Sequence, residues 1–169
     1  MPNHRTTPAT VRAAGTALAA VLAVAASLLT TTPAVARVPN AQAQVDAFLA
    51  QHPDARKVGP RQVSWRGGDV VMTFADQAGV TSTCSSGWSC LYEHRDFLGR
   101  MLQFRDCGYT QSLGAYGFAN MTTSWNNRRS RAAIVRNSGD LLWSAQGYTS
   151  SRYVGIADND KADTIYLSC

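Results

Sequence analysis

The stretch that decides the fold is "CLYEHRDFLGR", Cys90 to Arg100, which carries the spacing aromatic-x-x-x-x-aromatic-x-Gly in Tyr92, Phe97 and Gly99. Around it, residues 84–169 consist of short apolar runs separated by Gly, Asn, Asp and Ser. Each run is long enough for one β-strand, and no helical period competes with the alternation. Many short strands at regular intervals predict an all-β protein, an antiparallel sandwich or barrel.

The same part of the chain contains two approximate internal repeats. The segment "LYEHRDFLGR" at Leu91 is echoed by "LWSAQGYTSS" at Leu142, which matches Tyr92 with Trp143, Phe97 with Tyr148 and Gly99 with Ser150. A second echo relates "ANMTTSW", residues 119–125, to "NDKADTI", residues 159–165. We therefore expect the core to consist of two copies of one motif.

The ring-and-glycine spacing, followed some twenty residues later by a segment of the form N/D-N/D-x-x-S/T-S, resembles the Greek-key signature of the βγ-crystallins. More specifically, "CSSGWSCLYEHRDFLGRMLQF" with the later "SW" is similar to secreted bacterial peptidase inhibitors that carry this fold, whose type member blocks metalloproteinases. The resemblance covers residues 84–169, about half of the chain. It implies a βγ-crystallin-like double Greek-key sandwich.

In that fold the first two strands of each motif are joined by a folded hairpin on which the two rings stack. Gly99 would supply the positive φ of this hairpin, and Ser124 in the last strand would secure it by hydrogen bonding. Ser150 takes the glycine position of the second copy, where a left-handed backbone costs about 1 to 2 kcal/mol. The second hairpin is therefore expected to be altered. The alternative role for the four aromatic residues is simple packing in the core and at its edges.

Residues 1–36 have the pattern of a signal peptide. Arg5 and Arg12 make a basic start, residues 13–29 are a continuous run dominated by small apolar residues, and residues 34–36 form an A-x-A cleavage pattern. A membrane anchor is the alternative, but the run is Ala-rich, slightly short and followed directly by the cleavage pattern. Cleavage would leave a secreted chain that starts at Arg37 and retains no membrane segment.

The predicted mature chain is small and mildly basic. Cleavage removes two of the 16 basic residues and none of the 11 acidic ones, which leaves 14 minus 11, a net charge of +3. This charge does not indicate a nucleic-acid partner. The remaining 133 residues are enough for one ordinary core, and we expect a monomer.

Residues 37–80 predict a short helix followed by a β-hairpin. The helix has Asn40 available as its cap and Pro53 as its stop. In the hairpin, alternating apolar residues flank Gly67-Gly68: Val63 and Trp65 on one side, and Val70, Met72 and Phe74 on the other. A lone helix and hairpin are not stable by themselves. The segment therefore either docks on the main domain, residues 81–169, or is a propeptide that is removed.

All four cysteines lie in the predicted exported part: Cys84, Cys90, Cys107 and Cys169. An even number of cysteines in an oxidising compartment predicts two disulfides. Of the three possible pairings we expect Cys84–Cys90, a tight loop, and Cys107–Cys169, which ties the last residue to the body. A zinc site is the weaker alternative, because the chain has no C-x-x-C pair and few histidines.

The resemblance also points to calcium as a candidate ion. The segment "DNDKADT", residues 158–164, is rich in the oxygen ligands that calcium prefers. The resemblance implies that side-chain or backbone oxygens would come from both copies: Asn120, Thr123, Asn159, Asp160 and Asp163. The alternative is a polar turn whose side chains bond the local backbone. No other cofactor is expected.

Function is predicted from the resemblance: inhibition of an extracellular peptidase by a rigid loop. The cysteine pair that braces this loop in the type member has no counterpart here, so the sequence assigns no inhibitory loop. The short loop closed by Cys84 and Cys90 is either that loop or a structural clip.

An arginine run at residues 128–136 could contact an anionic polymer, although a solvated connector is the simpler interpretation. No catalytic motif occurs, and His52 and His94 are the only histidines of the mature chain. We therefore expect a protein that is not an enzyme, with a calcium-binding extracellular module as the alternative function.

Overall fold

The computed structural model describes residues 40–76 and 82–169. The predicted signal peptide, residues 1–36, lies outside the described residues. One α-helix, α1 (Ala41–Gln51), precedes eleven strands. The strands are β1 (Arg56–Gly59), β2 (Gln62–Trp65), β3 (Val70–Thr73), β4 (Ser89–Tyr92), β5 (Met101–Phe104), β6 (Thr110–Ser112), β7 (Ser124–Asn127), β8 (Ala133–Asn137), β9 (Asp140–Ala145), β10 (Thr149–Ser151) and β11 (Thr164–Leu167).

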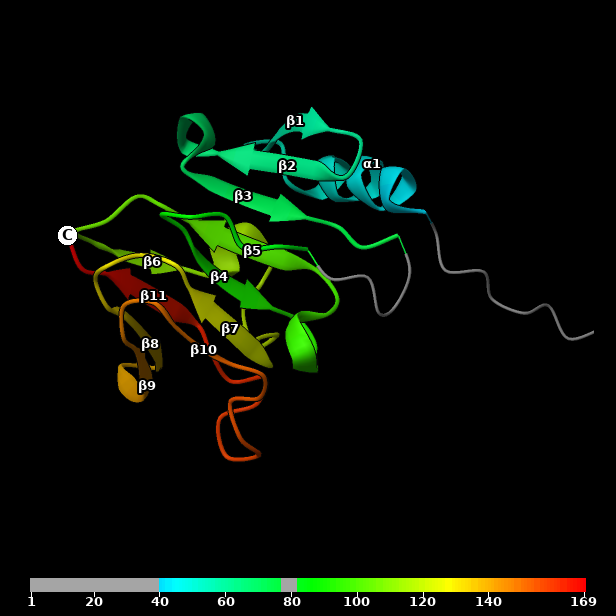
Figure 1. Cartoon of the computed structure of the whole chain (residues 1–169). Coiled ribbons are helices and arrows are strands. Elements are labelled where there is room, and N and C mark those ends of the chain that lie inside the picture. Colours follow the sequence, from blue (N-terminus) through cyan, green and yellow to red (C-terminus); the bar gives the residue numbers. More distant parts are fainter. Residues whose placement is uncertain (1–39, 77–81) are drawn as a thin grey trace, which may run out of the picture. The chain divides into compact units, whose positions relative to one another are not determined.

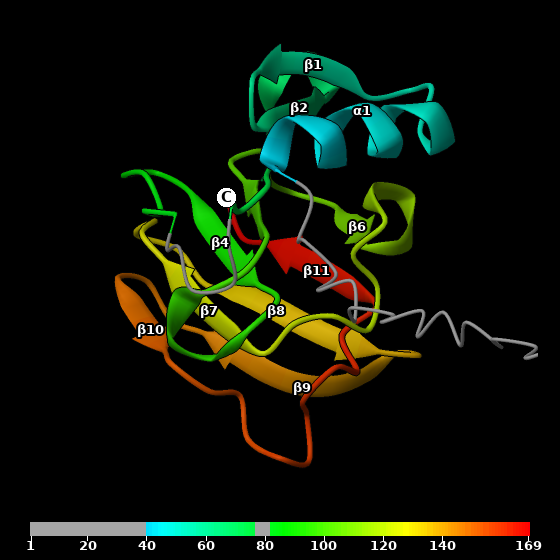
Figure 2. The same cartoon turned by 90° about the vertical axis from the view of Figure 1, so that its right-hand side faces the viewer.

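The strands form two antiparallel sheets (Figures 1 and 2). The seven-stranded sheet has the order β1-β2-β3-β5-β4-β7-β10, and the four-stranded sheet has the order β6-β11-β8-β9. Strands β4 to β7 make the first Greek key and β8 to β11 the second. Each key gives its third strand to the other sheet, because β6 pairs with β11 and β10 pairs with β7. This topology confirms the predicted all-β double Greek-key sandwich.

Apolar side chains from both sheets meet in one core. Leu102 and Phe104 of the first sheet belong to the same buried cluster as Val135, Ile165 and Leu167 of the second. In a strand, alternate residues point to opposite faces, so Ile165 and Leu167 both enter the core from β11. Full burial of a side chain of this size stabilises the fold by about 1.5–3 kcal/mol, and this layer is what holds the two sheets together.

The helix and hairpin that precede the Greek keys form as predicted. The side-chain oxygen of Asn40 accepts a hydrogen bond of 2.9 Å from the backbone N–H of Ala43 and caps α1. Ala41 and Val45 on the inner face of the helix are fully buried. No helix among the described residues is long and apolar enough to cross a membrane.

The hairpin extends the first sheet. Val63 lies opposite Met72 within it, and β3 pairs with β5 so that Val70 lies opposite Phe104. Its buried residues belong to the same core cluster as those of the Greek keys. Proteolytic removal of this segment, the alternative expected from the sequence, would have to break the β3–β5 ladder and expose that core.

The folded hairpin between β4 and β5 has the predicted structure. The rings of Tyr92 and Phe97 lie with their centroids 5.4 Å apart at an angle of 60°. Gly99 has a φ of +77°, and a Cβ atom at this position would lie 2.8 Å from Cδ2 of His94. The buried hydroxyl of Ser124 accepts from the N–H of Phe97 at 3.1 Å and donates to the carbonyl of His94 at 2.6 Å. One side chain thus fixes both arms of the hairpin.

The second hairpin is altered, as expected, but the predicted match of Tyr92 with Trp143 is wrong. Trp143 lies in β9, which is the second strand of its motif, and Ser150 lies in β10 without a positive φ. The first strand is β8, and a two-residue turn at Ser138 and Gly139 joins it to β9. The first and the second strand of a motif both show alternating apolar residues. The internal repeat in the sequence therefore could not tell which of the two strands carries Trp143.

Equivalent hydrogen bonds identify the true counterpart of Tyr92. The N–H of Thr123 donates to the carbonyl of Tyr92 at 2.9 Å, and the N–H of Asp163 donates to the carbonyl of Arg136 at 3.0 Å. Arg136 therefore takes the first-ring position of the second motif. The turn that follows is too short to fold back over a ring, so no second aromatic pair forms there.

We predict that Ser124→Ala destabilises the protein by about 1–3 kcal/mol, because it leaves a backbone N–H and a backbone carbonyl of the hairpin without their shared partner. Urea unfolding of the full chain, followed by tryptophan fluorescence, measures this change. Ser150→Ala, which alters an exposed serine, is the control and should stay within about 0.5 kcal/mol of the wild type. Equal stability of the two variants would contradict the role of Ser124.

An ion pair closes the base of the same hairpin. Arg100 donates from Nε to Oε2 of Glu93 and from Nη2 to Oε1, both at 3.0 Å. Burial opposes ionisation of Glu93, but the hydrogen bonds and the charge of Arg100 outweigh it, so the pKa of Glu93 is lowered from its ordinary value of 4.5. The ionised form is therefore favoured by folding.

The lowered pKa of Glu93 predicts a loss of stability in acid. A carboxyl group with a lower pKa in the folded state stabilises fully above its unfolded pKa, and this contribution disappears as the pH falls through the folded pKa. Thermal melting between pH 7 and pH 2.5 should therefore fall less steeply below about pH 4.5 for Glu93→Gln than for the wild type. Parallel melting curves for the two proteins would refute this.

Candidate functional site

Two loops with related sequences meet where the Greek keys join. The N–H of Asn120 donates to the carbonyl of Ala162 at 2.8 Å, and the N–H of Asp160 donates to the carbonyl of Thr122 at 3.2 Å. Asn120 and Asp160 also share a left-handed backbone, with φ of 58° and 54°. This reciprocal pattern confirms the second sequence echo and places residues 119–123 and 159–163 in equivalent positions.

Three of the five predicted calcium ligands line one cavity beside these loops. The hydroxyl of Thr123 donates to Oδ1 of Asp160 at 3.3 Å. The cavity has a volume of about 270 Å³, and the residues that line it are Glu93, His94, Asn120, Met121, Thr123 and Asp160. Glu93 and His94 were not predicted as lining residues, because they come from the folded hairpin and are distant in sequence from both loops.

The other two predicted ligands are placed differently. Asn159 does not line the cavity, and its side-chain amide donates to Oδ2 of Asp160 at 2.6 Å. Asp163 lies at the short turn of the second motif, where its Oδ2 accepts from the N–H of Ser138 at 2.6 Å. Asp163 is the counterpart of Thr123, so the two motifs offer related but separate sets of oxygens.

Several oxygens of these loops are buried without a hydrogen-bond partner: Oγ1 of Thr122, Oδ1 of Asn159 and Oδ1 of Asp163. An unpaired buried acceptor costs free energy, and a hard cation is one way to satisfy oxygen atoms of this kind. Within residues 40–76 and 82–169, however, no group of three or more His, Cys, Asp or Glu side chains is placed to hold a metal ion. The oxygens that could bind a metal ion here are thus hydroxyl, amide and single carboxylate oxygens, and these ligands suit calcium better than a transition metal.

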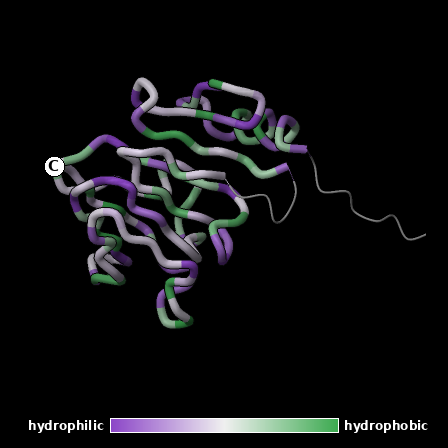
Figure 3. Tube along the Cα trace, viewed as in Figure 1, coloured by the Kyte–Doolittle hydropathy of each residue, from purple (hydrophilic) through white to green (hydrophobic). Residues whose placement is uncertain are grey.

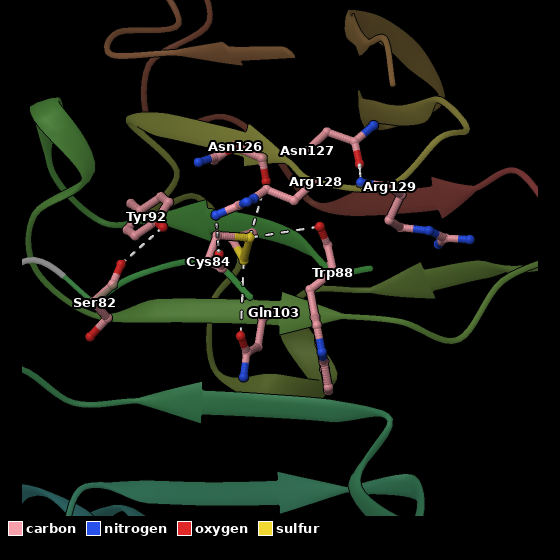
Figure 4. Close-up of a disulfide and its surroundings, with 10 residues drawn as sticks. Ser82, Cys84, Trp88, Tyr92, Gln103, Asn126, Asn127, Arg128 and Arg129 are labelled. Atoms are coloured by element: carbon pink, nitrogen blue, oxygen red, sulfur yellow. Dashed lines mark hydrogen bonds between the residues drawn. A yellow bond between two sulfur atoms is a disulfide. The ribbon is translucent and has the colours of Figure 1, made fainter. Parts of the chain in front are cut away.

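The predicted disulfide pairing is confirmed as Cys84–Cys90 and Cys107–Cys169. The first closes a short loop that lies against β7 (Figure 4). The N–H of Gly87 donates to the carbonyl of Arg128 at 3.0 Å, and the N–H of Arg128 donates to the carbonyl of Trp88 at 2.8 Å. The guanidinium of Arg128 also donates to the carbonyl of Cys84 at 3.3 Å. This loop is therefore clamped along its length.

Two arginines of the basic run, the exposed Arg128 and the partly buried Arg129, make hydrogen bonds to the backbone of other segments. Besides Arg128 at the disulfide loop, Arg129 donates from Nη2 to the carbonyl of Ser168 at 3.1 Å and holds the C-terminal segment. Its burial lowers the pKa of this guanidinium. Both side chains therefore do more than solvate a connector, because each donates to a backbone carbonyl of another chain segment.

The connection between β10 and β11, residues 152–163, projects away from both sheets in two perpendicular views (Figures 1 and 2). Its first part is anchored to the folded hairpin. The guanidinium of Arg95 lies 3.6 Å from the ring centroid of Tyr153, and Arg152 pairs with Asp96 at 3.4 Å. The N–H of Val154 donates to the carbonyl of Thr123 at 3.0 Å.

The tip of this connection is a closed turn. The N–H groups of Asp158 and Asn159 both donate to the carbonyl of Gly155, at 3.3 and 3.0 Å. Gly155 takes a φ of +97°, a conformation that favours glycine. Ile156 follows it and is 89% exposed, and Figure 3 shows hydrophobic colouring at the tip of the projecting connection. The run "RYVGIA", residues 152–157, is strand-sized in the sequence, but the structure has no strand there, because β10 ends at Ser151 and a turn begins at Gly155.

Comparisons with known proteins find similarity to a solved structure and no matching family. No protein-family model matches the chain, and no curated protein matches it. Among solved structures, one described as "Evolution of the eye lens beta-gamma-crystallin domain fold" is similar, with 15% sequence identity and a TM-score of 0.44. The match covers 54% of this chain and 95% of that chain.

Proposed function

We propose that this protein is a secreted inhibitor of extracellular peptidases that inserts a pre-ordered loop into the cleft of the enzyme and has no catalytic activity of its own. The single observation that carries the proposal is the connection between β10 and β11, which projects from the sandwich and is anchored to the Greek keys in its first three residues and again near its end. The signal-peptide pattern and the similarity of "CSSGWSCLYEHRDFLGRMLQF" to bacterial peptidase inhibitors agree with it.

Pre-ordering is what makes such a loop an inhibitor rather than a substrate. Fixing the backbone of a flexible residue costs about 1–2 kcal/mol, and a loop that is ordered before binding avoids this cost in the complex. Here the anchors are the Arg95–Tyr153 contact, the bond from Val154 to Thr123, and the bond from Asp160 to Thr122. All three join the connection to parts of the Greek keys that are themselves hydrogen bonded.

We predict stoichiometric inhibition of at least one secreted endopeptidase. The purified mature chain is titrated against metallo- and serine endopeptidases with fluorogenic peptides, and the remaining activity should fall linearly to zero near a one-to-one ratio. Mass spectrometry of the mixture should show the chain intact. Digestion of the chain without inhibition across both classes would contradict the proposal.

A calcium-binding module is the second candidate function. The observation that favours it is the meeting of Asn120, Thr123 and Asp160 around one cavity, next to loops with unpaired buried oxygens. Thr123 and Asp160 would offer the hydroxyl and carboxylate oxygens, and Asn120 an amide oxygen. The bound ion would connect the two Greek keys across the same junction that the reciprocal backbone bonds already span.

This second function predicts a calcium-dependent melting temperature. A ligand that binds only the folded state adds about 2.7 kcal/mol of stability at a concentration 100 times its Kd, so melting in millimolar calcium should occur above melting in EDTA. Asp160→Asn should reduce the difference, whereas Asp140→Asn, which changes an exposed carboxylate in β9, should keep it. Identical melting in calcium and in EDTA would exclude this function.

A further inference from the structure

We infer that Ile156 is the side chain that enters the target enzyme, and that the target is an endopeptidase whose specificity subsite accepts an aliphatic side chain. This inference rests on the proposed inhibitory function and names the contact residue and the class of partner. It follows from the exposure of Ile156, the geometry of its turn and the charges around it.

The exposure of Ile156 is unusual within the described part of the chain. Four large hydrophobic side chains are exposed there: Val58 at 55%, Leu141 at 57%, Tyr148 at 74% and Ile156 at 89%. Val58 and Leu141 lie within strands β1 and β9, and only Ile156 lies on the projecting connection between β10 and β11. An isoleucine held almost completely in water gains binding free energy whenever a partner covers it.

The backbone around Ile156 is closed rather than extended. Ile156 and Ala157 are the central residues of a turn whose ends are joined by the bond from the N–H of Asp158 to the carbonyl of Gly155. The N–H of Asn159 donates to the same carbonyl. The turn must lose these two bonds before the peptide bonds beside Ile156 can extend along an enzyme cleft. Ile156 can therefore fill a subsite while its own peptide bonds resist cleavage.

The charges near the tip decide between classes of peptidase. Residues 153–160, "YVGIADND", contain no Lys or Arg. The cations that flank them are Arg152, which is paired with Asp96, and Lys161, which lies beyond the turn of residues 155–158. A subsite built around a carboxylate to recognise Lys or Arg would find no cation in the turn that carries Ile156 and would face Asp158 there. A subsite lined by apolar side chains matches Ile156 and contains no buried carboxylate that would need a cation from the loop.

The test compares Ile156→Asp with Leu141→Asp, which places the same charge at another exposed aliphatic position. Inhibition constants are measured against metallo- and serine endopeptidases that cleave beside aliphatic residues, and against a serine endopeptidase that cleaves after Lys or Arg. We expect the wild type and Leu141→Asp to inhibit an enzyme of the aliphatic type equally. Ile156→Asp should be weaker by about 10- to 100-fold, the loss expected when a buried isoleucine contact is removed. Ile156→Val should retain most of the inhibition.

The outcomes separate this inference from the proposed function. Equal inhibition by the wild type and Ile156→Asp would overturn the assignment of Ile156 and leave the inhibitory function in place. Inhibition confined to the enzyme that cleaves after Lys or Arg would overturn the assignment of the partner class. If the wild type inhibits no enzyme of any class, both the function and this inference fail. Because Ile156 makes little contact with the fold, thermal melting of Ile156→Asp should match that of the wild type and exclude unfolding as the cause.

Discussion

The two Greek keys are tied together by a reciprocal pair of backbone hydrogen bonds, from Asn120 to Ala162 and from Asp160 to Thr122. Both loops need a left-handed residue to make this contact, which strains a non-glycine backbone. The bonds offset that strain. They also bring Thr123 beside Asp160 and set the point at which the projecting connection returns to the sandwich. The candidate cation site and the candidate inhibitory loop therefore depend on one junction.

The folded hairpin between β4 and β5 links this junction to the surface. Ser124, directly after Thr123, fixes the hairpin through Phe97 and His94. The hairpin in turn carries Arg95, whose guanidinium lies over Tyr153 at the start of the projecting connection. A chain of short, specific contacts thus runs from the centre of the sandwich to the loop that would meet a peptidase. Such a loop gains rigidity from the fold rather than from a disulfide of its own.

Local patterns predicted the elements that local interactions determine. The cap at Asn40, the hairpin around Gly67-Gly68, and the hairpin at Gly99 depend on residues close to one another in the chain, and all three were found as expected. The second hairpin was assigned wrongly, because Trp143 and Tyr148 occur at a suitable spacing but lie one strand too late. Alternation marks a strand without revealing its place in the motif. Only the pairing of β8 with β9 and β11 revealed it.

The sequence by itself determined an all-β core with two related motifs, two disulfides, and a preceding helix and hairpin, because strand alternation, cysteine number and turn residues are local properties of the chain. The tertiary structure decided which residues share a site. It separated Asp163 from Asp160, added Glu93 and His94 to the cavity, brought the guanidinium groups of Arg128 and Arg129 to backbone carbonyls, and left Ile156 exposed at the tip of an anchored loop. These outcomes depend on contacts between residues 25 or more positions apart, which no local pattern encodes.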